Sequence, residues 1–502
     1  MMWSGRRLCR RLLPLALLVV CSAVPPATAR ADLSGDVRSI LRDKYLNKVE
    51  MGVAVAKLGD SPQGSAVIYR FDSDIPLIPA SNLKLLTTSA FLDHFGADFK
   101  FRTVLLQKDQ DLYLIGDGDP ALGDAEMLKK LGWESTTVFK AWAEELKKRG
   151  VTSVRNVTVD DSVFDETFVH PNWLARYANS RYSAGVGGVN FNANCVDFFV
   201  RPTQPGEPAA VATDPPNTRY VAVKNQTITG GSESVVALLR APGKNDVTIR
   251  GDVRGSLGEP ASITVHDPPM FAATVLAETL SAGGVAVNGA VGRNRAVREE
   301  HAKDPAGWTV VAALDTKLAT VLDRANKDSM NLYAEALCKR LGHAASGGQP
   351  GSWENGPAAV AAFLTKIGVP ETQFRIDDGC GLSRDNSVSA DALLKVLAYN
   401  FHSRNKDAFI SSLAVGGADG TFERRFEGPL KGRVFGKSGY VNAVSAVSGY
   451  LKARDDQWYA FSILMNNCPP GTNNTAKQVQ ERIVAAIDAN AAPSTTTAAT
   501  GR

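Results

Sequence analysis

The chain has 502 residues, of which 44% are hydrophobic and 22% charged, and its formal net charge is +4. A single hydrophobic core rarely supports this length, so we expect two or three domains. Residues 1–29 contain four arginines and no acidic residue. The rest of the chain is therefore close to neutral and has no basic excess with which to hold nucleic acid.

Residues 1–31 have the pattern of a secretory signal peptide. The basic segment MMWSGRRLCRR precedes the apolar run LLPLALLVVCSAV, which is short for a membrane span, and A-x-A steps follow at residues 27–29 and 29–31. We therefore expect an exported protein of the periplasm or cell envelope, with no transmembrane span in the mature chain. A lipoprotein modified at Cys21 is a weaker interpretation, because Val20 stands where a small residue is usual.

The cysteines and histidines give no sign of a metal site. Four cysteines remain after the signal peptide, without any C-x-x-C pair, and the histidines are scattered without H-E-x-x-H spacing. Disulfides are possible in an exported protein, but buried free thiols are at least as plausible in a chain of this length. We expect no metal and no cofactor.

A helix over residues 33–46 and a hairpin are predicted after the signal peptide. The hairpin consists of two alternating segments, VAVAKLG (53–59) and SAVIYRF (65–71), joined by the turn-rich SPQG. A second helix is predicted from Ser81 to a stop at Gly96.

Beyond residue 104 the sequence becomes β-rich with polar loops, and from about residue 308 the pattern of long helices returns. Two apolar strands, residues 440–453 and 457–466, and a helix over residues 476–490, AKQVQERIVAAIDAN, close the ordered part. The small polar residues of 488–502 predict a disordered tail.

The helix at Ser81 begins with a candidate S-x-x-K motif, Ser81 to Lys84 in PASNLKLL. Residues three apart lie on one face of a helix, so the lysine amine can reach the serine hydroxyl. For a lone match, a serine N-cap followed by a solvated lysine is the better interpretation. A second match, Ser403 to Lys406, lies in a polar stretch and is discarded.

Two further short motifs, S-x-N and K-S-G, follow S-x-x-K along the chain. Residues 329–331 read Ser-Met-Asn at the start of an apolar helix, and residues 437–439 read Lys-Ser-Gly at the entry to a strand. Each motif alone has a structural explanation. Together with S-x-x-K they match the three elements of penicillin-interacting serine enzymes.

The residue types suit nucleophilic catalysis. Serine is a weak nucleophile that needs a base within hydrogen-bonding distance, and lysine is a base only when it is neutral. Burial and a second cation lower the pKa of a lysine, and Lys437 can supply that cation for Lys84.

The remaining groups can handle the proton and the developing charge. Ser329 can pass a proton to the leaving amine, and Asn331 can hold Lys84 and the substrate amide. Backbone N–H groups of Ser81 and Tyr440 are the candidates for an oxyanion hole.

Six segments resemble one family in sequence and order: PASNLKLLTT, YSAGVGGVNFNANCVDFFV, DSMNLYAEAL, DDGCGLSRDN, GGADGTFERRF and GKSGYVNAVSAVSGY. Over nearly the whole mature chain, the sequence is similar to class C penicillin-binding proteins, the D-alanyl-D-alanine carboxypeptidase/endopeptidase family. The resemblance implies an α/β (α+β) fold of the penicillin-binding-protein/serine β-lactamase-like transpeptidase type, with inserted β-rich domains.

The resemblance also implies a domain layout. The catalytic domain would be split into residues 32–103 and 303–487. An inserted domain II would comprise residues 104–197 and 255–302, and an inserted domain III residues 198–254. Since all three motifs lie outside the insert, we expect acylation not to require it.

The family's roles carry over to Ser81 as nucleophile, Lys84 as base, and Ser329 and Asn331 as catalytic residues. Substrate binding would fall to Lys437, Ser438, Gly439 and Tyr440, with Arg384 of GLSRDN near the substrate. The sequence departs from the family pattern at three positions: Met330 where Asp is common, KSGY where KTGT is usual, and Cys380 where Ser or Ala is usual. Tyr440 is the departure that bears most on substrate recognition.

The leading hypothesis is an exported serine carboxypeptidase/endopeptidase that trims peptidoglycan peptides ending in D-Ala-D-Ala, forms an acyl-enzyme and is inhibited by β-lactams. The alternatives are a β-lactamase or esterase of the same fold, or a catalytically silent wall-binding protein. An E-x-x-L-N element of class A β-lactamases was not found at its expected position, and the intact motif set argues against a silent protein.

Overall fold

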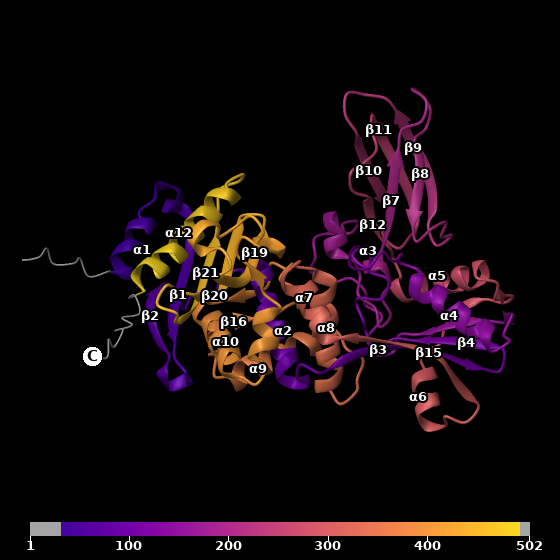
Figure 1. Ribbon diagram of the computed structural model, residues 1–502, viewed down its shortest axis with the longest axis horizontal. Coiled ribbons are helices and arrows are strands. Elements are labelled where there is room, and N and C mark those ends of the chain that lie inside the picture. The colour runs from indigo at the N-terminus through magenta and orange to yellow at the C-terminus, as the bar shows by residue number, and fades with distance from the viewer. Residues whose placement is uncertain (1–31, 492–502) are drawn as a thin grey trace, which may run out of the picture.

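The computed structural model describes residues 32–491 and has a mixed α/β architecture with several sheets. One lobe is built around a six-stranded sheet and a second lobe around a five-stranded sheet. Figure 1 shows a β-rich projection, β7 to β12, that extends from the second lobe. The predicted signal peptide, residues 1–31, and most of the predicted tail lie outside the described residues.

The six-stranded sheet is antiparallel and joins the two ends of the chain. In spatial order its strands are β18 (Ala414–Val415), β19 (Val434–Val441), β20 (Val444–Lys452), β21 (Trp458–Asn466), β1 (Glu50–Leu58) and β2 (Ala66–Phe71). The predicted hairpin is confirmed as β1 and β2. The strand predicted over residues 440–453 is confirmed as β20, but it begins later: Tyr440 and Val441 belong to β19, which forms a hairpin with β20, and Ala443 adopts a positive φ of 62° at the turn.

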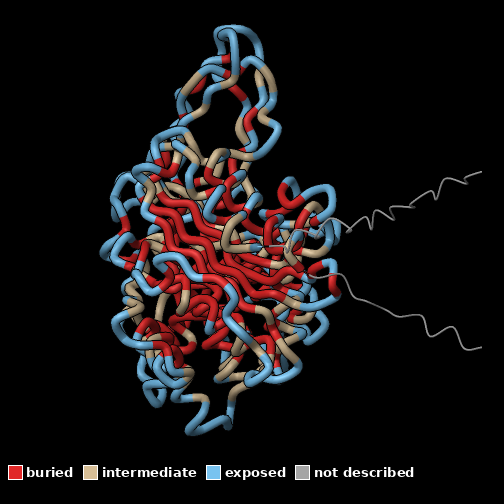
Figure 2. The backbone as a smooth tube through the Cα atoms, turned by 90° about the vertical axis from the view of Figure 1, so that its left-hand side faces the viewer, coloured by how far each residue is buried: buried red, intermediate tan, exposed pale blue. Residues whose placement is uncertain are grey.

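The alternation of β1 sends its side chains into two different cores. Val53 and Val55 pack in one core with α1 and α12, whereas Ala54 and Ala56 pack in the other with the long helices. Figure 2 shows the strands of this sheet buried between the two layers. The first layer consists of α1 (Leu33–Leu41) and α12 (Asn473–Asn490). The second consists of α2 (Leu83–Phe95), α7 (Leu318–Asn326), α8 (Asn331–Ala345), α9 (Asn355–Lys366), α10 (Ala390–His402) and α11 (Lys406–Ser411).

Both terminal helices differ from their predicted bounds. The helix predicted over residues 33–46 ends at Leu41 and is followed by a 3₁₀ turn, Lys44–Lys48. At the other end, α12 begins at Asn473, three residues before the predicted helix, and ends at Asn490 as predicted. Residues 488–490 of the predicted tail 488–502 are therefore helical, and Asp488 is buried against Arg433.

The five-stranded sheet builds the second lobe. In spatial order its strands are β14 (Val291–Arg293), β6 (Val157–Asp160), β4 (Asp111–Ile115), β3 (Lys100–Lys108) and β15 (Trp308–Lys317). The helices α4 (Thr137–Lys148) and α5 (Pro268–Ala282) share its main core, and α6 (Val297–Lys303) covers the other face. The predicted domain boundary at residue 104 falls within β3, and the one at residue 303 falls before β15. These two strands pair with each other along their length.

The projection carries two three-stranded sheets. One consists of β12 (Ala261–Thr264), β7 (Cys195–Arg201) and β8 (Ala210–Asp214), and the other of β10 (Val235–Arg240), β11 (Asp246–Val253) and β9 (Ala222–Thr229). The small elements are α3 (Ala125–Lys129) and two strand pairs, β5 (Ser153–Val154) with β13 (Ala286–Val287) and β16 (Phe374–Arg375) with β17 (Ser387–Val388).

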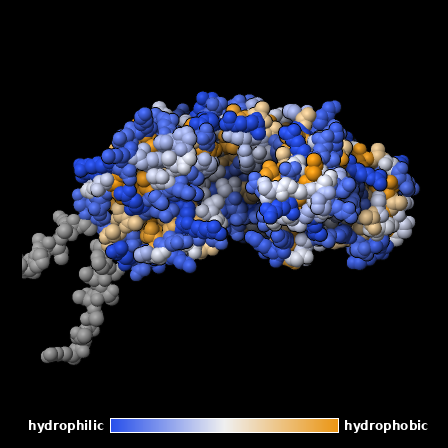
Figure 3. Space-filling model, turned by 90° about the horizontal axis from the view of Figure 1, so that it is seen from above, coloured by the Kyte–Doolittle hydropathy of each residue, from blue (hydrophilic) through white to orange (hydrophobic). Residues whose placement is uncertain are grey.

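The surface is mainly hydrophilic with small hydrophobic patches, and it is hollowed between the two lobes (Figure 3). None of the helices within residues 32–491 is long and apolar enough to cross a bilayer. The four cysteines of this region are free and buried, which decides between the two interpretations that the sequence left open.

Candidate active site

Ser81 lies on a 3₁₀ turn, Ala80–Asn82, that leads directly into α2. Pro79 precedes the turn, and Ala80 has a positive φ of 45°. Non-glycine residues rarely adopt this conformation, and it is found most often where surrounding structure holds a functional group in place. Ser81 does not cap the helix, so the N-cap interpretation of the first motif is wrong.

Lys84 lies one turn further on and is fully buried. Its Nζ is 2.9 Å from Ser81 Oγ, 2.6 Å from Asn331 Oδ1 and 3.0 Å from the carbonyl oxygen of Cys380. A neutral amine has two hydrogens and one lone pair. The two oxygens of Asn331 and Cys380 can only accept, so they take both hydrogens and leave the lone pair for the serine hydroxyl.

Burial lowers the pKa of Lys84, whereas the nearby Cys380, Asp378 and Glu335 act in the opposite direction. The pKa of Lys437 is lowered well below its usual value, first by burial and then by repulsion from Lys84. Both amines are therefore easier to deprotonate than a solvated lysine, as a lysine base requires.

The second motif lies where α7 turns into α8. Ser329 adopts a positive φ of 61° and faces the same cavity as Ser81. Asn331 is the first residue of α8; its Oδ1 accepts from Lys84, and its Nδ2 donates to the carbonyl of Tyr182 over 2.7 Å.

The third motif lies on β19, beside the 3₁₀ turn that carries Ser81. Lys437 is fully buried, and its Nζ donates to the carbonyl of Ser438 over 2.9 Å. Gly439 allows a close approach: a Cβ there would lie 2.8 Å from the Pro79 oxygen and 3.1 Å from the Ser81 nitrogen. Asn82 links the two elements by donating to the carbonyl of Lys437 over 3.2 Å.

A cavity of about 430 Å³ opens over these groups. It is lined by residues of the first two motifs, by Tyr440 directly after the third, and by two tyrosines of the insert: Ser81, Ser329, Asn331, Tyr440, Tyr177 and Tyr182. Lys437, Ser438 and Gly439 lie behind this lining on β19. Tyr440 is 58% exposed. Arg384 is exposed and does not line this cavity; its guanidinium donates to the carbonyl of Asn442, which does.

Sequence reasoning missed the loop that holds the Cys380 carbonyl against Lys84. Asp378 is fully buried and accepts from the N–H groups of Gly381 and Ser383, from the Asn386 side chain and from the indole of Trp173. The signal available in the sequence was Asp378, the second residue of the segment DDGCGLSRDN.

A second buried carboxylate, Glu335, lies one turn beyond Asn331 on α8. It accepts from the Gly379 N–H and the Trp353 indole, and burial raises its pKa to about 7. Glu335, Asp378 and Cys380 lie within 4.8 Å of one another. Since N–H donors already occupy both carboxylates, the cluster is explained by its protein partners.

The fold is similar to that of a solved penicillin-binding protein. The crystal structure of penicillin binding protein 4 (dacB) from Haemophilus influenzae is similar to it with a TM-score of 0.73 and 21% sequence identity, over 90% of this chain and 99% of that one. A second crystal structure of that protein, complexed with a novel β-lactam, has a TM-score of 0.68 at the same identity and covers 91% of this chain and 99% of that one. The expected fold class is confirmed.

Residues 33–490 match the D-Ala-D-Ala carboxypeptidase 3 (S13) family, and the chain belongs to this family of serine peptidases. The D-alanyl-D-alanine carboxypeptidase of Actinomadura sp. (strain R39) is 30% identical over 485 residues, which cover 91% of this chain and 85% of that protein. The chain is therefore a D-Ala-D-Ala carboxypeptidase, and the resemblance found in the sequence is confirmed.

Proposed function

We propose that Ser81 is the nucleophile of this carboxypeptidase and that Lys84 is its general base. The observation that supports this assignment is the set of three contacts at Lys84 Nζ, which aims the lone pair of a neutral amine at Ser81 Oγ. No other side chain is needed to orient the base, because Asn331 and the Cys380 carbonyl fix it from two directions.

In the proposed reaction, Ser81 Oγ attacks the carbonyl carbon of the D-Ala-D-Ala amide, and its proton passes to Lys84 Nζ. The tetrahedral oxyanion is held by the backbone N–H groups of Ser81 and Tyr440. The C–N bond then breaks, the proton on Lys84 Nζ passes through the Ser329 hydroxyl to the leaving amine, and an ester on Ser81 and a neutral Lys84 remain. Water hydrolyses the ester and restores the serine.

Substrate recognition belongs to β19 in this proposal. Lys437 and the Ser438 hydroxyl meet the terminal carboxylate, Gly439 lets the strand approach the nucleophile, and Tyr440 forms the exposed wall of the cavity. Arg384 acts indirectly by holding the Asn442 loop.

The substrate in the cell would be the peptidoglycan stem peptide that ends in D-Ala-D-Ala, with hydrolysis of cross-links as a second activity, and β-lactams would acylate the same serine. An exported protein of the periplasm or cell envelope fits this substrate and the predicted signal peptide.

Labelling with fluorescent penicillin tests the assignment. Wild type and Ser403→Ala should label equally, because Ser403 belongs to the discarded motif, whereas Ser81→Ala should not label. Label that persists in Ser81→Ala would refute the nucleophile. Release of hydrolysed penicillin at many turnovers per second would favour the β-lactamase alternative instead.

A further inference from the structure

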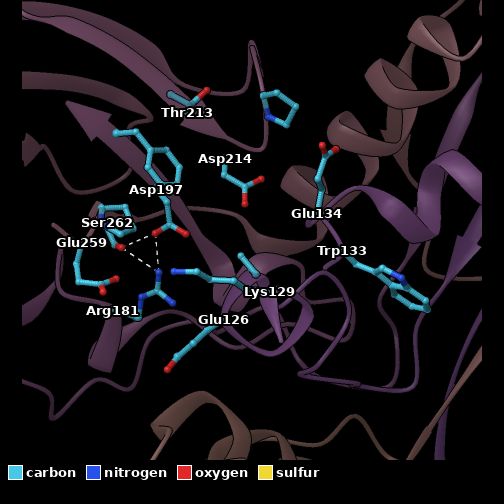
Figure 4. A pocket seen from close by; sticks show the side chains of 14 residues that line it. Glu126, Lys129, Trp133, Glu134, Arg181, Asp197, Thr213, Asp214, Glu259 and Ser262 are labelled. Atoms are coloured by element: carbon cyan, nitrogen blue, oxygen red, sulfur yellow. Dashed lines mark hydrogen bonds and ion pairs between the residues drawn. The ribbon is translucent and has the colours of Figure 1, made fainter. Parts of the chain in front are cut away.

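A second cavity of about 630 Å³ lies in the insert, between α3 and the strands β7, β8 and β12. In Figure 4, Arg181, Asp197 and Ser262 are joined on one side of it, and Trp133 and Glu134 lie on the other. Arg181 donates to Asp197 over 2.5 Å and to Ser262 over 2.9 Å, so this side is a fixed group of polar atoms.

This cavity adjoins the catalytic one through a single 3₁₀ turn, Arg181–Ser183. Arg181 lines the second cavity, and the next residue, Tyr182, lines the catalytic cavity and accepts from Asn331. A polymer whose reacting end lies at Ser81 can therefore continue past this turn into the second cavity.

The cavity has many carboxylates, and most of them are held in place by a partner within the protein. Four of its five carboxylates have a partner. The pairs are Glu126 with Arg324, Glu134 with Lys140, Asp197 with Arg181, and Asp214 with the hydroxyl of Ser135. Groups held in this way offer oriented acceptors and donors, which suit the hydroxyl and amide groups of a sugar.

The apolar part of the lining is exposed and partly aromatic. Trp133 is 51% exposed and Phe199 is 42% exposed, and Pro216 and Pro260 complete it. Large rings left open to solvent beside fixed polar groups are typical of a binding site. Sugars have apolar C–H faces that stack on such rings and hydroxyl edges that bind carboxylates.

We propose that the second cavity binds the glycan strand of N-acetylated sugars in the polymer whose peptide enters the catalytic cavity. The inference rests on the proposed function for the identity of the polymer. Glycan held beside the Arg181–Ser183 turn would raise the local concentration of attached peptides at Ser81.

Calorimetric titration of the full mature chain with a tetramer of N-acetylglucosamine tests the site. Wild type and Ser81→Ala should bind the tetramer equally. Trp133→Ala and Phe199→Ala should bind it about tenfold more weakly, since each variant loses an aromatic surface that the sugar would cover on binding. Phe71→Ala is the matched control: Phe71 is 37% exposed, on β2 of the other lobe, and its loss should leave binding unchanged.

The same variants should separate polymer from peptide. Phe199→Ala should cleave insoluble peptidoglycan several-fold more slowly and a free pentapeptide at the wild-type rate. The proposal is overturned if wild type shows no saturable binding of the tetramer, if Phe71→Ala loses as much as Phe199→Ala, or if a lysine tripeptide binds there in place of the sugar. Penicillin labelling of Ser81→Ala would instead overturn the proposed function and leave the glycan result standing.

Discussion

At the scale of single residues, the surroundings of the Lys84 side chain decide whether its amine can act as a base. Its amine is buried, its two acceptor partners are fixed, and its pKa is lowered by burial. An arginine at this position keeps the charge but cannot give up its proton.

We predict that Lys84→Arg lowers the rate of penicillin acylation by about 10²–10⁴, the usual contribution of a general base. In wild type the rate should rise with pH as Lys84 loses its proton, with an inflection below 10.5, the ordinary lysine value. The variant should lack that inflection. Lys406→Arg, in the discarded motif, is the control. A Lys84→Arg enzyme with the wild-type rate and pH profile would exclude lysine as the base.

Ser438 allows a second test at this scale. Because Tyr440 replaces the usual second hydroxyl of the motif, carboxylate recognition should rest on Ser438 and Lys437. Ser438→Ala should lose about tenfold or more in kcat/KM on a D-Ala-D-Ala peptide, equivalent to about 1.5–3 kcal/mol for a hydrogen bond to a charged group. The loss on the C-terminal amide should be much smaller. Equal losses on acid and amide would show that Ser438 does not read the carboxylate.

The sequence indicated the three motifs but not the atoms that complete them. Ser81, Lys84, Ser329, Asn331 and Lys437 stand in short patterns whose chemistry can be argued locally. The carbonyl of Tyr182 and the indole of Trp173 cannot, because their partners lie 149 and 205 residues away in the chain. A backbone carbonyl also has no residue type that a pattern could reveal.

At the scale of elements, the loop of residues 377–386 positions Lys84, the proposed base, through the carbonyl of Cys380. Asp378 organises it as an acceptor for four N–H donors. The helical pattern predicted long helices in this half of the chain, but a loop that is fixed by one carboxylate has no periodicity to detect.

Asp378→Asn should disturb this loop, because an amide presents hydrogens where the carboxylate accepted them. We predict that the acylation rate falls at least about tenfold, in line with the loss of hydrogen bonds to a buried charge. Asp378 raises the pKa of Lys84, so its neutralisation should also move the pH inflection of acylation to lower pH. Asp385→Asn, on an exposed residue of the same loop, should change neither quantity. A variant with an unchanged inflection would show that Asp378 is only structural.

At the scale of the whole molecule, the insert is tied to the catalytic helices by buried polar contacts. Asp124, fully buried, binds Arg324 of α7 over 2.9 Å and the hydroxyl of Tyr333 of α8 over 2.6 Å. Together with Tyr182 and Trp173, these contacts argue against our expectation that acylation does not require the insert. That expectation considered only where the motifs lie in the chain.

Asp124 and Glu126 give a matched comparison, because both bind Arg324 over 2.9 Å but Glu126 is 59% exposed. Asp124→Ala should reduce the free energy of unfolding by about 1–3 kcal/mol, because Arg324 loses its only fully buried partner among these contacts and the buried hydroxyl of Tyr333 loses its acceptor. Glu126→Ala should reduce it by no more than about 1 kcal/mol. Urea unfolding measures both. Similar losses in the two variants would mean that the insert is not anchored at Asp124.

The pairing of β1 with β21 sets the moment at which a newly made chain can first react. The two strands pair from Glu50 with Asn466 to Leu58 with Trp458, so one is synthesised at the start and its neighbour near the end. A two-stranded hairpin is at best marginally stable alone, and ribosomes add about 5–20 residues per second, so β1 waits roughly 20–80 s for its partner. Lys437 and Gly439 also emerge late. With Ser81 as the proposed nucleophile, a nascent chain contains the serine and its lysine long before it can be acylated, and we expect reactivity toward penicillin to mark the completion of folding.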